Sequence, residues 1–282
     1  MPTSDTPGKQ LLDCAGIALD LKTPVVMGIL NITSDSFYDG GSYLTQTAQL
    51  KQTEKMLSEG ASIIDIGAVS TRPGADPVSG KEELGRLLPA LKALKCYFPK
   101  TIFSVDTHLS KVAKASIDNG AGMINDIYGG RFDEKIMKVV SQANIPYVLM
   151  HMQGVPADMQ INPHYKDVLK EVKDFFLQQL SKFPKTYHQI ILDPGFGFGK
   201  SVEHNYRLLA FFDSFREFGY PLMAGISRKS MINRVLHIQP TEALNGSTVL
   251  NTVALMKGAD ILRVHDVKEA MEAIKLVEAL NS

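Results

Sequence analysis

The feature that most constrains the fold of this chain is a series of eight short apolar runs, each ending in or near a polar or small residue. Segments whose apolar residues have helical spacing lie between them. The runs cover residues 25–30, 63–66, 102–106, 123–126, 147–151, 190–193, 222–225 and 261–265. They recur about every 33 residues, close to the ~31 per strand–helix unit of a (β/α)₈ barrel. The sequence therefore predicts an α/β fold, a single-domain TIM barrel.

The remaining segments fit this arrangement. Helical spacing is found at residues 48–57, 82–94, 112–117, 168–180 and 270–280. Residues 1–24 are predicted to be an N-terminal preamble, extended over 11–21, and residues 25–282 the barrel. The length of 282 residues would also accommodate two smaller domains, but no linker or low-complexity segment interrupts the series.

Charge and composition narrow the possible partners. Thirty basic residues balance thirty acidic ones, so we expect no nucleic-acid partner and no binding to a charged membrane surface. No segment has the length and apolarity of a signal h-region or a membrane span. Cys14 and Cys96 have no metal or redox spacing, which favours a reducing compartment. We therefore expect a cytoplasmic protein that acts on small molecules.

Polar residues close several of the predicted strands, and in a barrel such residues gather at one mouth, where barrel enzymes carry out their chemistry. Because side chains alternate along a strand, Asp106, Arg263 and His265 can all point into this mouth. Asn125 and Asp126 have opposite parity, and we expect Asn125 to face inward. Whether Asp65 is structural or functional stays open.

Asp193 ends a buried run and is followed by Pro194 and by glycines at positions 195, 197 and 199. The proline ends the strand, and the glycines are expected to let the loop come close to whatever the carboxylate binds. The alternative is that Asp193 only caps the following helix.

The rim residues divide into two chemical groups. Asp106, Asn125 and Asp193, two carboxylates and an amide, offer the acceptors that a flat heterocycle with several N–H donors requires. The basic residues Lys229, Arg263 and His265 suit an anionic portion, because the loops after strands seven and eight commonly bind phosphate in barrels. Alternatively, Lys229 is a solvated surface residue and His265 a core histidine. Two long loops at residues 31–41 and 67–75 are expected to close over substrate, unless they are ordinary connecting turns.

Eight motifs in register along the chain resemble those of the dihydropteroate synthases, a family of pterin-binding enzymes. They are found at residues 27–33 with 35–37, 70–74, 104–107, 124–126, 149–154, 192–200, 227–231 and 263–267. The resemblance covers essentially everything from Val25 onward. It implies a transferase of folate biosynthesis that joins 4-aminobenzoate to 6-hydroxymethyl-7,8-dihydropterin diphosphate, giving 7,8-dihydropteroate and diphosphate. It also implies Mg²⁺ as cofactor, a homodimer, and a place among the targets of sulfonamides.

The resemblance also implies roles for individual residues. The pterin ring would be read by Asp106, Asn125, Asp193 and Lys229. The diphosphate would be held by Asn31, Thr71, Arg72, Arg263 and His265, with Asn31 also a ligand of Mg²⁺. The aminobenzoate would lie near Thr71, Arg72, Phe198 and Ser230, and the closing first loop would contain Asp35, Phe37 and Asp39. Asp106, Lys229, Arg263 and Asn31 would take part in catalysis.

The chain departs from the family pattern at Ser34, where proline is usual, and at Ala68-Val69, where Gly-Glu is usual. Val69 removes a charge, so any role of that glutamate is in doubt here. Two other functions are considered. A methyltetrahydrofolate-dependent methyltransferase shares the ring pocket but holds no diphosphate, and a non-catalytic paralogue would bind pterin without turnover. Arg263-Val264-His265 and residues 70–74 argue against the first, and retention of the contact residues argues against the second.

Overall fold

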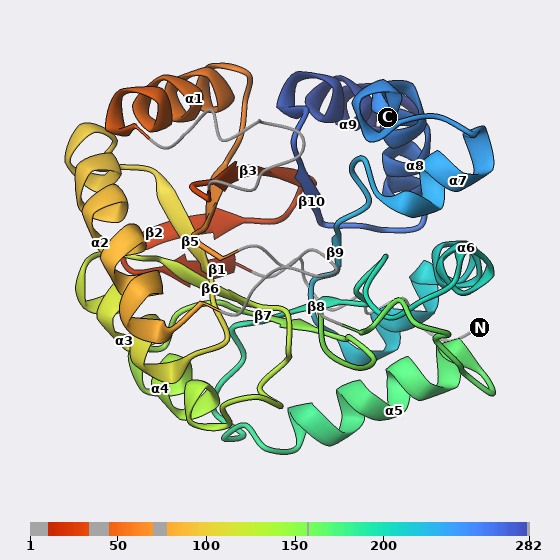
Figure 1. Cartoon of the computed structure of the whole chain (residues 1–282), viewed down its shortest axis with the longest axis horizontal. Helices are drawn as coiled ribbons and strands as arrows, with labels where there is room; N and C mark the ends of the chain where they lie inside the picture. Colours follow the sequence, from red (N-terminus) through yellow and green to blue (C-terminus); the bar gives the residue numbers. More distant parts are fainter. Residues whose placement is uncertain (1–10, 34–44, 70–77, 157, 281–282) are drawn as a thin grey trace.

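Eight parallel strands form the centre of the molecule, in a computed structural model that describes residues 11–33, 45–69, 78–156 and 158–280. They pair in the order β8-β7-β6-β5-β4-β3-β10-β9, and a parallel bridge between Leu192 and Leu222 joins the last strand to the first. The predicted barrel is confirmed (Figure 1). The strands are β3 (Val25–Asn31), β4 (Ile63–Gly67), β5 (Ile102–Asp106), β6 (Met123–Asp126), β7 (Tyr147–Met150), β8 (Ile190–Asp193), β9 (Met223–Ala224) and β10 (Ile261–Val264).

Helices follow one another around the outside of the barrel (Figure 1). They are α1 (Gln46–Ser58), α2 (Gly80–Tyr97), α3 (Ser110–Asp118), α4 (Lys135–Ala143), α5 (Val168–Leu180), α6 (Val202–Ala210), α7 (Ser230–Leu236), α8 (Leu244–Met256) and α9 (Val267–Leu280), with 3₁₀ turns η1 (Phe212–Phe218) and η2 (Pro240–Glu242). The hydroxyls of Thr45 and Ser79 cap α1 and α2, which start before their first predicted apolar position. None of these helices has the length and apolar character that a bilayer span requires.

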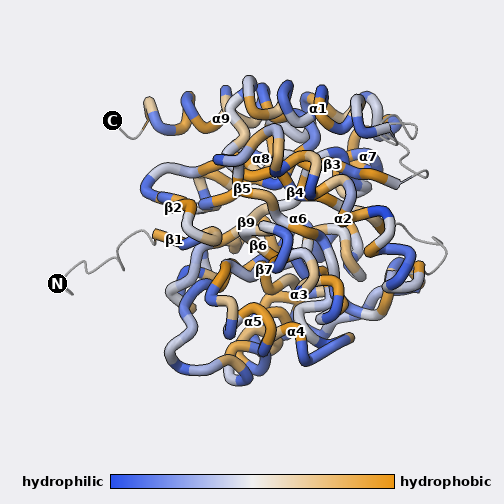
Figure 2. Tube along the Cα trace, turned by 90° about the vertical axis from the view of Figure 1, so that its left-hand side faces the viewer, coloured by the Kyte–Doolittle hydropathy of each residue, from blue (hydrophilic) through white to orange (hydrophobic). Residues whose placement is uncertain are grey.

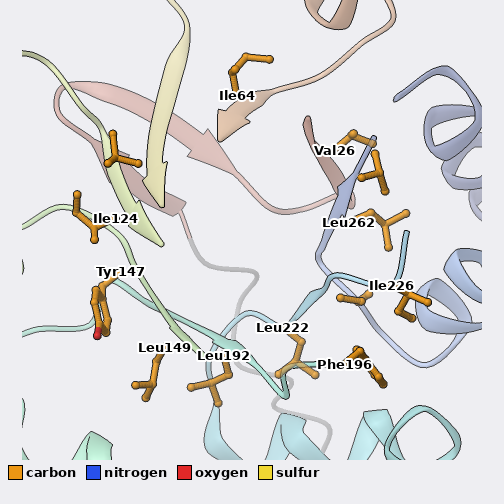
Figure 3. Packing of buried hydrophobic residues seen from close by; sticks show 14 of the residues in the cluster. Val26, Ile64, Ile124, Tyr147, Leu149, Leu192, Phe196, Leu222, Ile226 and Leu262 are labelled. Carbon is orange, nitrogen blue, oxygen red and sulfur yellow. The ribbon is translucent and has the colours of Figure 1, made fainter. Parts of the chain in front are cut away.

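The main hydrophobic core lies between the strands and the helices. Alternate residues of each strand point outward into it, for example Val26, Ile64, Ile124 and Leu262 (Figure 3). Along the chain trace, hydrophobic residues concentrate towards the centre and hydrophilic residues towards the outer turns (Figure 2). Burial on both faces explains why the strands read as continuous apolar runs rather than as an alternating pattern.

A β-hairpin closes the amino-terminal end of the barrel. Its strands β1 (Leu11–Cys14) and β2 (Ile17–Asp20) are antiparallel, and the turn between them places Ala15 and Gly16 at φ of 55° and 84°. The preamble predicted as extended is thus a paired hairpin. One face of the hairpin packs against the inward-facing strand residues at this amino-terminal, lower end of the barrel. This lower cluster contains Leu12, Cys14, Leu19, Leu21, Val25, Met27, Ile63, Ile102, Met123, Val148, Ile191, Met223 and Ile261.

Candidate active site

The carboxyl ends of the strands carry the polar side chains, at the end of the barrel opposite the hairpin. The register pairs Asp106 of β5 with Gly67 of β4 and with Asn125 of β6. One layer below, Asp65 pairs with Ser104. Asp65, Ser104 and Asn125 are all buried and share the inward parity. The interior of the barrel therefore changes from apolar at the hairpin end to polar at the mouth.

Arg263 of β10 is held by two carboxylates. Its Nε lies 2.8 Å from Oδ2 of Asp65, and one terminal nitrogen lies 2.7 Å from the same oxygen and 3.2 Å from Oδ2 of Asp106. Burial raises the pKa of Asp106 to about 7, against the lowering effect of Arg263. Burial alone would lower the pKa of Arg263, but Asp65 and Asp106 together raise it. The guanidinium is thus a permanent charge at the centre of the mouth. Asp65, whose role the sequence left open, points inward and belongs to this cluster.

Asn125 and Asp126 point to opposite sides of β6, as strand parity predicted. The Asn125 amide nitrogen donates to Oδ2 of Asp65 at 3.0 Å. Asp126 accepts hydrogen bonds from the backbone N–H of Tyr128 and Gly130 and from the hydroxyl of Tyr147. Asp126 thereby orders the loop that follows β6, and Asn125 is the member of the pair that reaches the mouth.

Three functional side chains meet beside Gly225, which follows β9. A Cβ at Gly225 would lie 3.6 Å from Nζ of Lys229 and 3.9 Å from both Oδ2 of Asp193 and Cβ of Arg263. Asp193 and Arg263 therefore lie at the same end of the barrel. Burial lowers the pKa of Lys229 to about 8 against the raising effect of Asp193, and burial raises the pKa of Asp193 against the effect of Lys229. The two groups form an interacting acid–base pair in the mouth.

Lys229 is oriented by the loop that follows β8. Its Nζ donates to the carbonyl of Phe196 at 2.5 Å and lies 4.6 Å from the centre of the Phe198 ring. Phe198 in turn packs against an apolar cluster of Ile127, Met150, Met152 and Met159. These four residues were not predicted to belong to the site, although Ile127 and Met150 share the inward parity of Asn125 and Val148. They supply an apolar wall of the kind that a flat ring requires.

The glycines after Asp193 were predicted to let the loop approach a ligand. In the structure they mainly let it approach another loop of the protein. All three have positive φ, and a Cβ at Gly195 or Gly199 would collide with the carbonyl oxygen of His151 or Gln153. The close approach is between two loops of the protein itself. Asp193 Oδ1 accepts from the backbone N–H of Gly195 at 2.7 Å, which turns the chain directly after the strand.

Lys200 fastens the same two loops and was not singled out from the sequence. Its buried Nζ lies 2.9 Å from the carbonyl of Gly195, 3.0 Å from that of Phe198 and 3.0 Å from Nδ1 of His151. Burial lowers the pKa of both Lys200 and His151 well below their usual ranges. Neutral His151 can accept a hydrogen bond from Lys200, so this pair is a structural clamp for the loop that carries Phe198.

The last two loops of the barrel are joined by Arg228 and Asp266. Arg228 donates from Nε and from a terminal nitrogen to the two carboxylate oxygens of Asp266, both at 2.8 Å. Next to them, Oγ of Ser227 lies 3.1 Å from Nδ1 of His265. Burial and the neighbouring Arg263 lower the pKa of His265 to about 3. His265 was predicted to act with the cations Lys229 and Arg263, but this lowered pKa makes its imidazole neutral near pH 7.

The other predicted site residues fall into two groups. Asn31 ends β3 half-buried, and its Oδ1 lies 3.2 Å from the position of a Cβ on Gly67; Ser230 is exposed at the start of α7. Asp35, Phe37, Asp39, Thr71 and Arg72 lie outside the described residues, as does Ser34. Ala68 is buried and its carbonyl faces Arg86.

Proteins with similar sequences all point to one family. Residues 27–265 match the family described as pterin binding enzyme. Dihydropteroate synthase of Escherichia coli K12 is 45% identical over 267 residues, covering 94% of each chain, and that of Haemophilus influenzae is 44% identical over 264 residues, covering 93% of this chain and 95% of the relative.

Solved structures agree with these relatives. The Yersinia pestis dihydropteroate synthase with a sulfonamide drug complex has a TM-score of 0.92 at 42% identity, covering 96% of this chain and 99% of that one. The Xanthomonas albilineans dihydropteroate synthase with 4-aminobenzoic acid has a TM-score of 0.88 at 38% identity, covering 96% and 98%. The chain therefore belongs to the pterin-binding enzyme family and, within it, to the dihydropteroate synthases.

Proposed function

We propose that this protein condenses 4-aminobenzoate with 6-hydroxymethyl-7,8-dihydropterin diphosphate to give 7,8-dihydropteroate and diphosphate. The observation that carries the proposal is the meeting of Asp193, Lys229 and Arg263 around Gly225, with Asp106 and Asn125 attached through Arg263 and Asp65. Acceptors for a nitrogen-rich ring and a fixed cation for a phosphate group thus share one barrel mouth.

The ring is proposed to bind deepest. Asp193, which is 3% exposed, and Asn125, which is 2% exposed, offer acceptor oxygens to its N–H groups. Lys229 donates to a ring acceptor from beside Asp193. The apolar cluster of Ile127, Met150, Met152 and Met159 contacts a ring face. Buried polar groups that find partners only in the bound ring give strong discrimination against rings that lack them.

The leaving group is proposed to depart towards β10. Arg263 stabilises the charge that develops on the diphosphate as the carbon–oxygen bond breaks. His265 acts there as a neutral hydrogen-bond donor. Ser227 accepts from the backbone N–H of His265 and can donate its own proton to Nδ1, which leaves the imidazole proton on Nε2 for a phosphate oxygen.

The carbon left behind is a methylene cation conjugated with the pterin. Ionised Asp106, half-buried at the end of β5, is proposed to stabilise this cation electrostatically. The amine of 4-aminobenzoate then attacks the carbon and loses a proton. Its aromatic ring is proposed to lie near Phe198, and its carboxylate near Ser230 at the start of α7. No covalent bond to the protein is required.

Mg²⁺ is proposed as the cofactor, and the donors at the mouth are compatible with it. Within the described residues no group of three or more His, Cys, Asp or Glu side chains could hold a metal ion. Mg²⁺ commonly keeps several waters and binds substrate phosphates with few protein ligands, so the amide oxygen of Asn31 would be a suitable contribution. When bound, the ion would neutralise part of the diphosphate charge.

The decisive experiment is the coupled measurement of both products. The purified protein with 4-aminobenzoate, the pterin diphosphate and Mg²⁺ should release diphosphate and form dihydropteroate in equal amounts. Omitting either substrate should abolish dihydropteroate formation. A protein that binds the pterin without releasing diphosphate would be a non-catalytic paralogue. A protein that instead transfers a labelled methyl group from methyltetrahydrofolate to a cobalamin acceptor would be a methyltransferase.

We expect a narrow bell-shaped dependence of kcat/KM on pH. Asp106 has to be ionised, and its raised pKa of about 7 makes activity rise through that pH. Lys229 has to be protonated, and its lowered pKa of about 8 makes activity fall above that pH. Because kcat/KM reports the free enzyme, these are the relevant groups. Asp106→Asn should remove the acidic limb and keep the alkaline limb; an unchanged profile in this variant would contradict the assignment.

The protein is further proposed to be a homodimer that acts in the cytoplasm. Exposed apolar residues gather on helices α7, α8 and α9, which lie together in Figure 1: Val235, Leu236, Val249, Met256, Leu276 and Leu280. Exposed apolar residues on neighbouring helices favour self-association. Cys14 and Cys96 are both free thiols, which suits a reducing compartment.

Light scattering should give twice the chain mass of 31.0 kDa for the wild type. The double variant Val249→Glu with Met256→Glu should be monomeric, because it places two charges on the proposed interface. Leu177→Glu on α5, also at an exposed apolar position, is the matched control and should stay dimeric. A monomeric wild type at micromolar concentration would disprove the dimer.

A further inference from the structure

A single carboxylate oxygen joins two functional side chains beneath the mouth. Asp65 on β4 is fully buried, and its Oδ2 accepts from Nε of Arg263 at 2.8 Å and from the amide nitrogen of Asn125 at 3.0 Å. A terminal nitrogen of Arg263 approaches the same oxygen to 2.7 Å. The three residues come from β4, β10 and β6, so only the closed barrel brings them together.

This contact determines which end of the Asn125 amide meets a ligand. An ionised carboxylate accepts hydrogen bonds and cannot donate them, whereas an amide has an NH₂ end and an oxygen end. The amide therefore turns its NH₂ towards Asp65, and its oxygen points away. Within the described part of the chain, Oδ1 of Asn125 is buried and has no hydrogen-bond partner. A buried acceptor of this kind awaits a donor, because leaving it unpaired is costly.

The pairing with Arg263 also fixes the role of this oxygen: Oδ2 of Asp65 accepts from the guanidinium, so it meets Asn125 as an acceptor. Asp106 contacts Arg263 from the side of the mouth, at 3.2 Å. Asp65 thus supports Arg263 from below while Asp106 lies beside the substrate.

We propose that Asp65 is a positioning and specificity-determining residue: it fixes the Asn125 amide so that only a ring N–H donor is accepted, and it aims Arg263 at the departing diphosphate. The proposal rests on the proposed function and adds a residue to it. Asp65 itself does not touch the substrate. Its effect on ring binding passes through Asn125, and its effect on diphosphate binding passes through Arg263.

The test exchanges the two side chains. Asn125→Asp retains acceptor oxygens for the ring but sets a second carboxylate against Asp65, so binding of 6-hydroxymethyl-7,8-dihydropterin should weaken about 100-fold, the range expected for a lost buried hydrogen bond with repulsion. Combining it with Asp65→Asn removes the charge repulsion at unchanged total charge. The single atom that meets both Arg263 and residue 125 cannot accept from one and donate to the other, so recovery should be incomplete. The swapped protein should recover ring affinity to within about tenfold of wild type. Calorimetry measures both affinities.

Two double-mutant cycles test the effect of removing the Asp65 carboxylate. Asp65→Leu should weaken ring binding about tenfold in the wild type and not at all in an Asn125→Ala background. The same variant should weaken binding of inorganic diphosphate in the wild type but not in an Arg263→Ala background. Ser104→Ala, an inward-facing neighbour of Asp65 in the same layer, is the control and should change neither affinity.

The outcomes separate this proposal from the proposed function. If Asp65→Leu does not fold, the charge-conserving swap decides alone. Recovery of ring affinity in the swap supports the positioning role, and a swap that binds no better than Asn125→Asp overturns it. Additive effects in the double-mutant cycles overturn it as well, while wild-type dihydropteroate formation on the same preparation leaves the function intact. A wild type that binds neither pterin nor diphosphate would refute the function itself.

Discussion

Replacing Arg263 with lysine should lower kcat/KM for dihydropteroate formation about 1,000-fold, because a preorganised charge in a buried site commonly contributes 10²–10³ in rate. The guanidinium contacts Asp65 and Asp106 at once, with three separations between 2.7 and 3.2 Å. A lysine ammonium is a point charge and cannot reproduce this forked geometry. The variant would leave two buried carboxylates poorly compensated and would offer the leaving diphosphate a misplaced cation.

The measurement is steady-state diphosphate release with both substrates varied. The acidic limb of the pH profile should move to higher pH, because Arg263 is the group that lowers the pKa of Asp106. Arg216→Lys is the matched control, since Arg216 pairs with Asp260 at 3.2 Å on the partly exposed outside of the barrel. Its activity should stay within about threefold of wild type, as exposed ion pairs contribute little. If kcat/KM of Arg263→Lys stayed within tenfold of wild type, the forked guanidinium contacts would not have the central role argued here.

Gly195→Ala should have the largest effect on stability. The added Cβ would collide with the carbonyl oxygen of His151, a backbone atom that cannot move aside without shifting β7. Gly195 also has a φ of 71°, where a side chain is strained. The two effects together should cost about 4 kcal/mol, from ~1–2 for the left-handed backbone and ~1–3 for overpacking. Activity should fall too, because the same loop holds the Phe196 carbonyl that orients Lys229.

Urea unfolding of Gly219→Ala provides the comparison. Gly219 has a nearly identical φ of 74°, and nothing lies within 4 Å of the position its Cβ would take. This variant therefore isolates the backbone cost and should lose about 1–2 kcal/mol. Equal losses of unfolding free energy in the two variants would show that the contact with His151 is unimportant.

Features that depend on local pattern were predictable from the sequence. The eight strands follow from short apolar runs, and the inward direction of Asn125 rather than Asp126 follows from strand parity alone. Helix α5 occupies the predicted residues because its capping residue Asp167 and its apolar spacing agree. Helix α8 has little helical period in its sequence, because apolar residues such as Val249 and Met256 occupy its outer face as well.

Features that depend on long-range contact could not be read in the same way. Lys200 appears in the sequence as one more residue after a glycine-rich stretch, yet its nitrogen is surrounded by His151 and by two carbonyls of its own loop. The neutral state of His265 depends on burial and on Arg263, which only the folded barrel provides. Asp65 and Arg263 are 198 positions apart, so their ion pair has no local signature.

The hairpin of β1 and β2 has a consequence for how reactants travel. The hairpin covers one end of the barrel with a buried apolar layer, so substrates reach the interior from the opposite end. With the pterin ring bound deepest, as proposed, it should enter before 4-aminobenzoate, and dihydropteroate should leave through the same opening. We therefore expect ordered binding, with the pterin diphosphate first.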